Sequence, residues 1–420
     1  MTLPEDDIPL EPPAGPDGAL SATTEPEREP SDADQRPPVE SGIPERKGMS
    51  VRSALTAGML GLVYVSLFLS GGEAAVFALS GLEVVPFLVL AVLAYAATDR
   101  RWLKGLALGY WVVLVGGIGA FCFLFGFIGV VDPEMQSMVS KSDPSDVPIP
   151  EPTLEQLIRI GFVAISVFVS FIIGLACFLP TVRRGFARVI NIDAQSFVHA
   201  TAVATAVGAS LLLITPLLFS SQPPLLALVT AEGAADMPDG GEQLRSSVYI
   251  LIWTVPASLI AVGFPRKRTL NEALCRLGLV LPSRRNLVCA IIAAVLLVFI
   301  AQALDTWSTR LWLAMGWQTT DQEAVWKLFS FALGPVGAVI VAITAGLGEE
   351  LVFRGVLQSR IGILLSSFLF TSVHAFQYNF DGLVQVLLLG FIFGLIRKLS
   401  NTSTSALVHG GYDLIAFLGM

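Results

Sequence analysis

Two adjacent carboxylates and an arginine interrupt a very apolar region near the C-terminus, in the segment AGLGEELVFRGVLQSR at residues 345–360. Glu350 and Arg354 are four residues apart, so in a helix they lie on one face within reach of an ion pair. Glu349 is rotated from Glu350 by about 100° and projects elsewhere. Because an ionised carboxylate buried in hydrocarbon is costly unless it is paired or solvated, the spacing predicts a structural Glu350–Arg354 pair. It leaves Glu349 free to act.

Two of the three histidines of the chain follow in the next apolar segments. His374 lies late in SSFLFTSVHAF, one helical turn after Phe370, and His409 precedes Asp413 by four residues in ALVHGGYDLIAF. A carboxylate and a nearby histidine can activate a water and pass its proton to a leaving group. A second histidine, oriented by Asp413, can stabilise an oxyanion. These residue types fit peptide hydrolysis, whereas His199 has no acidic neighbour in sequence and is expected to be structural.

The composition places these residues in a membrane. The chain has 420 residues, of which 54% are hydrophobic and only 14% charged, whereas soluble proteins carry roughly 25% charged residues. Its apolar runs have the length that a helix needs to cross a bilayer. We therefore predict an all-α, polytopic integral membrane protein with the lipid bilayer as a partner and no nucleic-acid partner.

The first 48 residues differ from the rest of the chain. Residues 1–48 are acidic and Pro-rich without apolar periodicity, which predicts a disordered tail, and they lack the pattern of a signal peptide. We expect an accessory transmembrane bundle over 49–264 and a core that carries the ionisable residues over 265–420. Eleven apolar segments are candidate spans, at about residues 53–70, 83–97, 105–131, 157–179, 199–221, 247–264, 287–304, 332–357, 361–376, 383–396 and 403–419.

The connecting loops alternate in charge. Loops 98–104, 181–190 and 265–285 are rich in arginine and lysine, whereas loops 132–156 and 229–246 are acidic. Lysine and arginine accumulate on the cytoplasmic side of a membrane. With eleven crossings, this alternation predicts a cytoplasmic N-terminus.

Three motifs in this order resemble the CAAX-protease and bacteriocin-processing family of intramembrane endopeptidases, also called CAAX prenyl endopeptidase type II or Abi. They are Glu-Glu-x-x-x-Arg at 349–354, Phe-x-x-x-His at 370–374 and His-x-x-x-Asp at 409–413. The resemblance covers about residues 330–418, and RTLNEALCRLGLVLPSRRN before the seventh span looks like the lead-in of bacterial members. It implies a protease core, in a bacterial plasma membrane, that acts on a membrane protein or peptide.

The resemblance also implies roles for individual residues. Glu349 and His374 would activate the water, and His409 with Asp413 would stabilise the oxyanion. Three residues would support the geometry of the site: Glu350, Arg354 and Phe370. Members that process prenylated eukaryotic proteins carry asparagine where this chain has Asp413, so cleavage of a prenylated tail is not implied. The oligomeric state and the substrate are left open.

The same residues leave open whether the site holds a metal cofactor. Glu349, His374 and His409 could ligate zinc, but a glutamate-activated water without metal fits them equally, and we favour the metal-free interpretation. The scattered cysteines form no Cys-x-x-Cys pair and indicate neither a metal site nor a disulfide framework; they are Cys122, Cys177, Cys275 and Cys289.

Two other functions fit parts of the sequence. The first is a non-catalytic membrane protein of the same fold that serves as an immunity factor or scaffold. The second is a proton-coupled transporter that uses Glu349 and the histidines as a relay. A transporter should carry ionisable residues at depth in both halves, and the first six predicted spans contain almost none.

Overall fold

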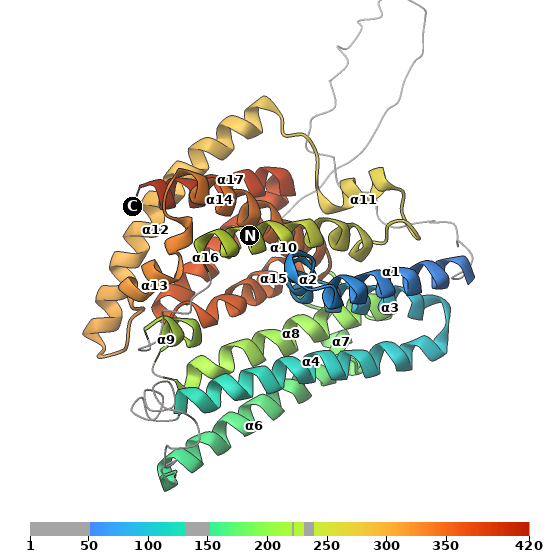
Figure 1. The fold of residues 1–420 in the computed structure, drawn as a ribbon, viewed down its shortest axis with the longest axis horizontal. Coiled ribbons are helices and arrows are strands. Elements are labelled where there is room, and N and C mark those ends of the chain that lie inside the picture. Colours follow the sequence, from blue (N-terminus) through green and yellow to red (C-terminus); the bar gives the residue numbers. More distant parts are fainter. Residues whose placement is uncertain (1–50, 131–151, 221, 231–238, 420) are drawn as a thin grey trace, which may run out of the picture. The chain divides into compact units, whose positions relative to one another are not determined.

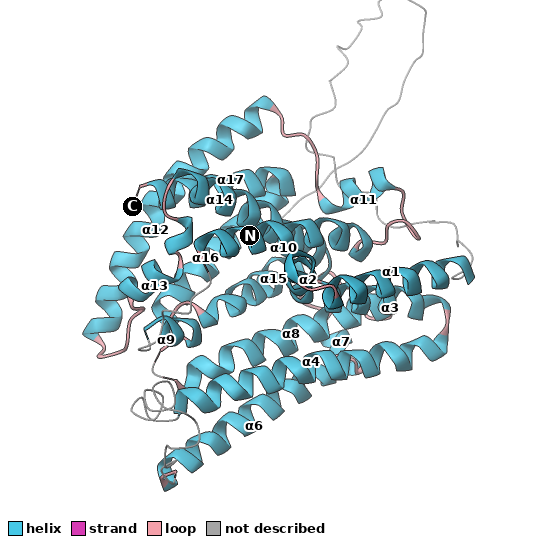
Figure 2. Ribbon diagram, viewed as in Figure 1, coloured by secondary structure: helices cyan, strands magenta, loops and turns pink. Residues whose placement is uncertain are grey.

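The computed structural model describes residues 51–130, 152–220, 222–230 and 239–419. These residues are helices joined by short connections, and no strand occurs among them (Figure 2). The predicted all-α class is therefore confirmed. The predicted disordered tail, most of the acidic loop 132–156 and part of loop 229–246 lie outside the described residues, so those predictions stay untested.

The helices follow one another along the whole described chain (Figure 1). The α-helices are α1 Val51–Leu69, α2 Gly72–Ser80, α3 Val85–Asp99, α4 Arg101–Val130, α6 Leu154–Ala176, α7 Pro180–Phe186, α8 Phe197–Phe219, α9 Pro224–Thr230, α10 Gly240–Ala261, α11 Leu270–Leu277, α12 Arg284–Ala314, α13 Gln322–Leu328, α14 Pro335–Glu349, α15 Ser359–Val373, α16 Phe380–Leu399 and α17 Thr402–Leu418. Shorter elements are the 3₁₀-helices η2 Gly81–Glu83, η4 Ser330–Ala332 and η6 His374–Phe376, and the π-helix η5 Glu350–Gln358.

The predicted count of eleven spans is not confirmed. Among the described residues, seven helical segments are long and apolar enough to cross a membrane, or eight if α2, η2 and α3, which bend by 53°, form one span. One segment, Pro335–Phe376, covers most of two of our predicted spans, because the chain stays helical through η5 into α15 and only kinks at Gly362, where φ is 78°. Helix α17 has only 17 residues, and α1 offers a short apolar stretch, Met59–Leu69.

Helices α4, α6 and α8 pack against one another (Figure 1). Trp111 of α4 is fully buried among them, and its indole nitrogen donates a hydrogen bond to Thr205 at 3.0 Å. Gly174 of α6 faces Gly208 of α8 so closely that a Cβ on Gly174 would lie 2.8 Å from the Cα of Gly208. This packing is almost entirely apolar, as the sequence predicts for a transmembrane bundle.

The C-terminal helices pack against this bundle through α15, which contacts α8. Buried Arg360 of α15 also donates hydrogen bonds to the hydroxyl of Tyr95 on α3 and to the carbonyl of Ala261 on α10. All the described residues belong to one compact unit. The division between an accessory bundle over 49–264 and a core over 265–420 stays a prediction, as does the cytoplasmic N-terminus.

Candidate active site

The site is built where α14 crosses α17. A Cβ on Gly346 of α14 would lie 2.7 Å from the Cα of Gly410, and a Cβ on Gly410 would lie 2.5 Å from the carbonyl oxygen of Ala342. Two glycines therefore let the backbones approach to a distance that side chains would forbid. Gly410 is one of the two glycines between His409 and Asp413. The crossing brings Glu349, at the end of α14, to His409.

Glu350 and Arg354 lie on the π-helix η5 rather than on the α-helix that we expected. Both side chains have no exposed surface, and Arg354 Nε is 3.4 Å from Glu350 Oε2, so the predicted ion pair is present. The guanidinium also lies 5.1 Å from the centre of the Phe370 ring. π-Helical turns are rare and frequent at functional sites. Here the turn carries the only fully buried carboxylate–arginine pair among the described residues.

Helix α11 supports this turn from outside the motifs. Its N-terminus is closed by a capping box between Thr269 and Glu272, and it ends at Gly278 in a left-handed conformation. Leu277 of α11 packs against Leu351 and approaches Gly355, where a Cβ would lie 3.1 Å from the Leu277 side chain. The lead-in segment before the seventh span therefore contacts the element that carries Glu350.

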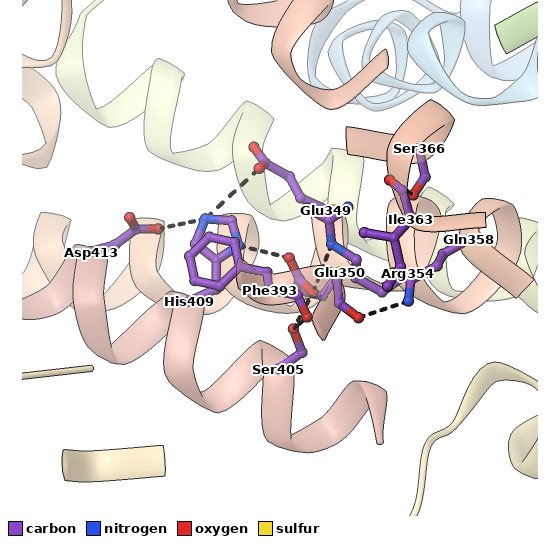
Figure 3. Close-up of polar contacts among 11 residues, drawn as sticks. Glu349, Glu350, Arg354, Gln358, Ile363, Ser366, Phe393, Ser405, His409 and Asp413 are labelled. Atoms are coloured by element: carbon purple, nitrogen blue, oxygen red, sulfur yellow. Dashed lines mark hydrogen bonds and ion pairs between the residues drawn. The ribbon is translucent and has the colours of Figure 1, made fainter. Parts of the chain in front are cut away.

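His409 lies among three carboxylates, as Figure 3 shows. Its Nδ1 is 3.2 Å from Glu350 Oε1, and its Nε2 is 3.5 Å from Asp413 Oδ2 and 3.9 Å from Glu349 Oε2. The imidazole also stacks on Phe393, with ring centres 4.4 Å apart. Because carboxylates only accept hydrogen bonds, Nδ1 donates to Glu350. Glu350 therefore orients His409, a role that we had assigned to Asp413 alone.

The structure adds Ser405 to the predicted residues. Its hydroxyl lies 2.6 Å from Glu350 Oε2, and this contact is buried. Ser405 precedes His409 by four residues, so both side chains lie on the face of α17 that meets η5. The i, i+4 spacing was a signal in the sequence, but serine is too common in transmembrane helices for that spacing to stand out.

The two adjacent glutamates have different surroundings. The side chain of Glu349 is 34% exposed, whereas that of Glu350 has no exposed surface. Glu350 has three polar partners, Arg354, Ser405 and His409. Within the described part of the chain, the one ion-pair contact of Glu349 is the longer one to His409. The arrangement therefore leaves Glu349 accessible to water and substrate.

His374 lies beside this cluster without a direct bond to it. Its Nδ1 is 2.7 Å from the carbonyl oxygen of Phe370. A carbonyl only accepts, so Nδ1 carries the hydrogen and Nε2 is the free nitrogen of the neutral ring. Within the described residues no hydrogen bond or ion pair joins His374 to Glu349. The ring of Phe370 lies between the two histidines, with its centre 4.8 Å from His374 and 6.1 Å from His409.

Tyr378 is a further residue of this region that the motifs do not include. Its ring stacks on His374 with centres 6.2 Å apart. Burial raises the pKa of the Tyr378 phenol, and the carboxylates of Asp413 and Glu349 raise it further, so the phenol keeps its proton. Its segment is held by Thr320, whose backbone nitrogen and hydroxyl donate to the buried Asp381. No spacing in the sequence connects Tyr378 to the site.

Comparison with known protein families points to the same part of the chain as the geometry does. Residues 331–415 match the family model described as type II CAAX prenyl endopeptidase Rce1-like. The predicted resemblance is confirmed. The match contains Glu349, His374, His409 and Asp413 and leaves the first 330 residues unassigned. No curated protein and no solved structure matches the chain.

The apolar helices and the match of residues 331–415 to an endopeptidase family together support an integral membrane protein. The family match does not supply a metal site. Among the described residues, no three His, Cys, Asp or Glu side chains are placed to hold a metal ion. Our alternative set of zinc ligands, Glu349, His374 and His409, is therefore not among the groups that the described residues bring together. The term metalloprotease is therefore not supported.

Proposed function

We propose that this chain is an intramembrane endopeptidase that hydrolyses a peptide bond of a membrane-associated protein or peptide. The observation that carries the proposal is the one-third-exposed Glu349 beside His409, within a segment that matches a protease family. The buried Glu350–Arg354 pair is a supporting structure, because neither group has surface that a substrate can reach.

The proposed reaction begins with a water held by Glu349. The carboxylate accepts a proton from the water, and the resulting hydroxide attacks the carbonyl carbon of the peptide bond. His409 Nε2, next to Asp413, donates a hydrogen bond to the oxyanion that forms. The proton taken by Glu349 then passes to the amide nitrogen as the C–N bond breaks. His374, whose Nε2 is free, would assist in activating the water.

Tyr378 would supply a neutral donor in this acidic region. Glu349, Glu350 and Asp413 are acceptors when ionised, so the site is rich in negative charge and poor in donors. The phenol of Tyr378 stays protonated beside these carboxylates. Its stacking on His374 also fixes the plane of that imidazole. We therefore assign Tyr378 as a positioning residue of the proposed site.

The decisive experiment compares membranes from cells that express wild type or Glu349→Gln at matched levels, by proteomics enriched for peptide termini. We expect protein termini with wild type that are absent with Glu349→Gln. The matched control is Glu323→Gln, since Glu323 lies on α13 in an exposed pair with Lys327, and it should behave as wild type. Identical termini in all three samples, with folded and abundant proteins, would contradict the proposal and favour a non-catalytic scaffold.

We also propose a bacterial plasma membrane location with the N-terminus and loop 265–285 in the cytoplasm, on the basis of the charges of the loops. Cys275 lies in that loop and is exposed. A thiol reagent that cannot cross membranes should label Cys275 only after cells are opened, with Cys275→Ser as the control. Labelling of Cys275 in intact cells would contradict this orientation.

A further inference from the structure

An apolar groove lies between α7 and α15, away from the residues of the proposed active site. Its volume is about 520 Å³, within the range of ligand-binding pockets. Every side chain that lines it is apolar, including Val182, Phe186 and Ile190 from α7 and the segment after it, and Leu364, Leu365 and Phe368 from α15. The groove is suited to a hydrocarbon chain.

Three arginines alternate with the groove residues of the α7 segment. Arg183 is half-buried, and Arg184 and Arg188 are exposed. Within the described part of the chain, no carboxylate pairs with any of the three, and Arg183 Nε is buried without a hydrogen-bond partner. Helix α7 joins α6 to α8, which are both candidate membrane spans, so it lies at their ends. Unpaired cations therefore stand at a membrane face beside an apolar groove.

We propose that this groove binds an acyl chain of an anionic phospholipid whose phosphate is held by Arg183, Arg184 and Arg188. Basic residues at the ends of membrane helices attract anionic headgroups, and arginine matches the geometry of a phosphate. A neutral lipid or an apolar peptide would fill the groove and leave the three charges without a partner. The charge complementarity therefore selects an anionic lipid.

The groove also adjoins the helix that leads to His374. Gly362 breaks α15 with φ 78°, and a Cβ there would lie 3.7 Å from the Ile190 side chain. The same helix supplies Leu364, Leu365 and Phe368 to the groove and ends at Val373, directly before His374. A bound lipid would contact α15 along these turns. The inference goes beyond the proposed peptidase activity and does not depend on it.

The test measures lipid binding to the purified full chain by native mass spectrometry in a neutral detergent. Phosphatidylglycerol and phosphatidylcholine with identical acyl chains are titrated separately. We expect phosphatidylglycerol to bind roughly 30- to 100-fold more tightly. The combined variant Arg183→Gln, Arg184→Gln and Arg188→Gln should lose roughly 30- to 100-fold of that affinity and little affinity for phosphatidylcholine.

The matched control removes three exposed cations from another loop, as Arg100→Gln, Arg101→Gln and Lys104→Gln, and should keep the affinity of wild type for phosphatidylglycerol. Equal binding of both lipids, or an equal loss in the control variant, would overturn the proposal.

A second variant tests the groove itself. Gly185 lines the groove and has open space where a Cβ would stand, so Gly185→Trp should fold, keep all three arginines and fill the space. We expect it to weaken binding of both lipids at least tenfold while the thermal unfolding temperature stays unchanged. Undiminished phosphatidylglycerol binding by this folded variant would overturn the groove as the site. A farnesylated peptide that binds the wild-type protein more tightly than phosphatidylglycerol does would also overturn the proposal, because the occupant would then be a peptide.

Discussion

Two helix crossings in this molecule both depend on a pair of facing glycines, but their consequences differ. In one, Gly174 of α6 meets Gly208 of α8, and in the other, Gly346 of α14 meets Gly410 of α17. A Cβ added at Gly174 or Gly346 would lie 2.8 Å or 2.7 Å from the Cα of the facing glycine, so the two approaches are equally tight. The first crossing is covered by the buried ring of Trp111. The second lies beside ionisable residues.

The difference shows what a close crossing contributes to a site. Bringing two backbones together forces the side chains of the neighbouring turns into contact, whatever their type. Beside the α6–α8 crossing these side chains are apolar and yield packing. Beside the α14–α17 crossing they are Glu349 and His409, which the crossing brings to 3.9 Å. The glycines therefore provide proximity, and the residues next to them decide whether that proximity is structural or chemical.

The largest expected effect is a loss of cleavage rate without a loss of stability when Glu349, beside the α14–α17 crossing, is replaced. Glu349→Gln removes the proposed base, so we expect the rate of substrate cleavage to fall by about 10³-fold or more. The free energy of unfolding should hardly change, because Glu349 is one-third exposed. Activity and thermal stability measured on the same purified samples test this. A rate within tenfold of wild type would refute the role of Glu349 as base.

Arg354→Ala should lower the free energy of unfolding by about 3–5 kcal/mol, because it leaves Glu350 buried without its partner. The matched control is Arg310→Ala on α12, at an exposed position, which should change stability by less than about 0.5 kcal/mol. Unfolding by denaturant in detergent measures both. An Arg354→Ala protein of normal stability that lacks only activity would contradict the supporting role of the ion pair.

The two crossings are compared directly by Gly174→Ala and Gly346→Ala. Each adds a methyl group against a facing backbone, so we expect each variant to lose about 1–3 kcal/mol of stability. Only Gly346→Ala should also lower the cleavage rate, since it separates Glu349 from His409. Gly105→Ala on α4, where the added Cβ meets no atom within 4 Å, is the control. Equal loss of activity at both crossings would remove the proposed distinction.

The smallest expected effect concerns Tyr378. Tyr378→Phe keeps the stacking on His374 and removes one donor, so we expect kcat to fall about fivefold, equivalent to roughly 1 kcal/mol, with KM and stability little changed. Tyr110→Phe, which loses a hydroxyl bonded to the Pro86 carbonyl, should keep full kcat. Wild-type kcat in Tyr378→Phe would show that only the ring of Tyr378 matters.

The fold class and the identity of the motif residues were predictable because both depend on local patterns. Long apolar runs allow only helices in a bilayer, and the i, i+4 spacings of Glu350–Arg354 and His409–Asp413 place their side chains on one face of any helix. The number of spans was less predictable. A helical segment that runs through η5 into α15, with a kink at Gly362, joins two apolar runs, and α17 is short for a crossing.

The sequence by itself determined that ionisable residues sit in a membrane segment and that Glu350 pairs with Arg354. Only the tertiary structure decided that His409 is oriented by Glu350, that Ser405 and Tyr378 join this region, and that Glu349 alone of the two glutamates stays accessible. The physical reason is that pairs within one helix turn are fixed by the helical repeat. Contacts between helices depend on where the backbones cross, and the glycines at 346 and 410 set that crossing through packing.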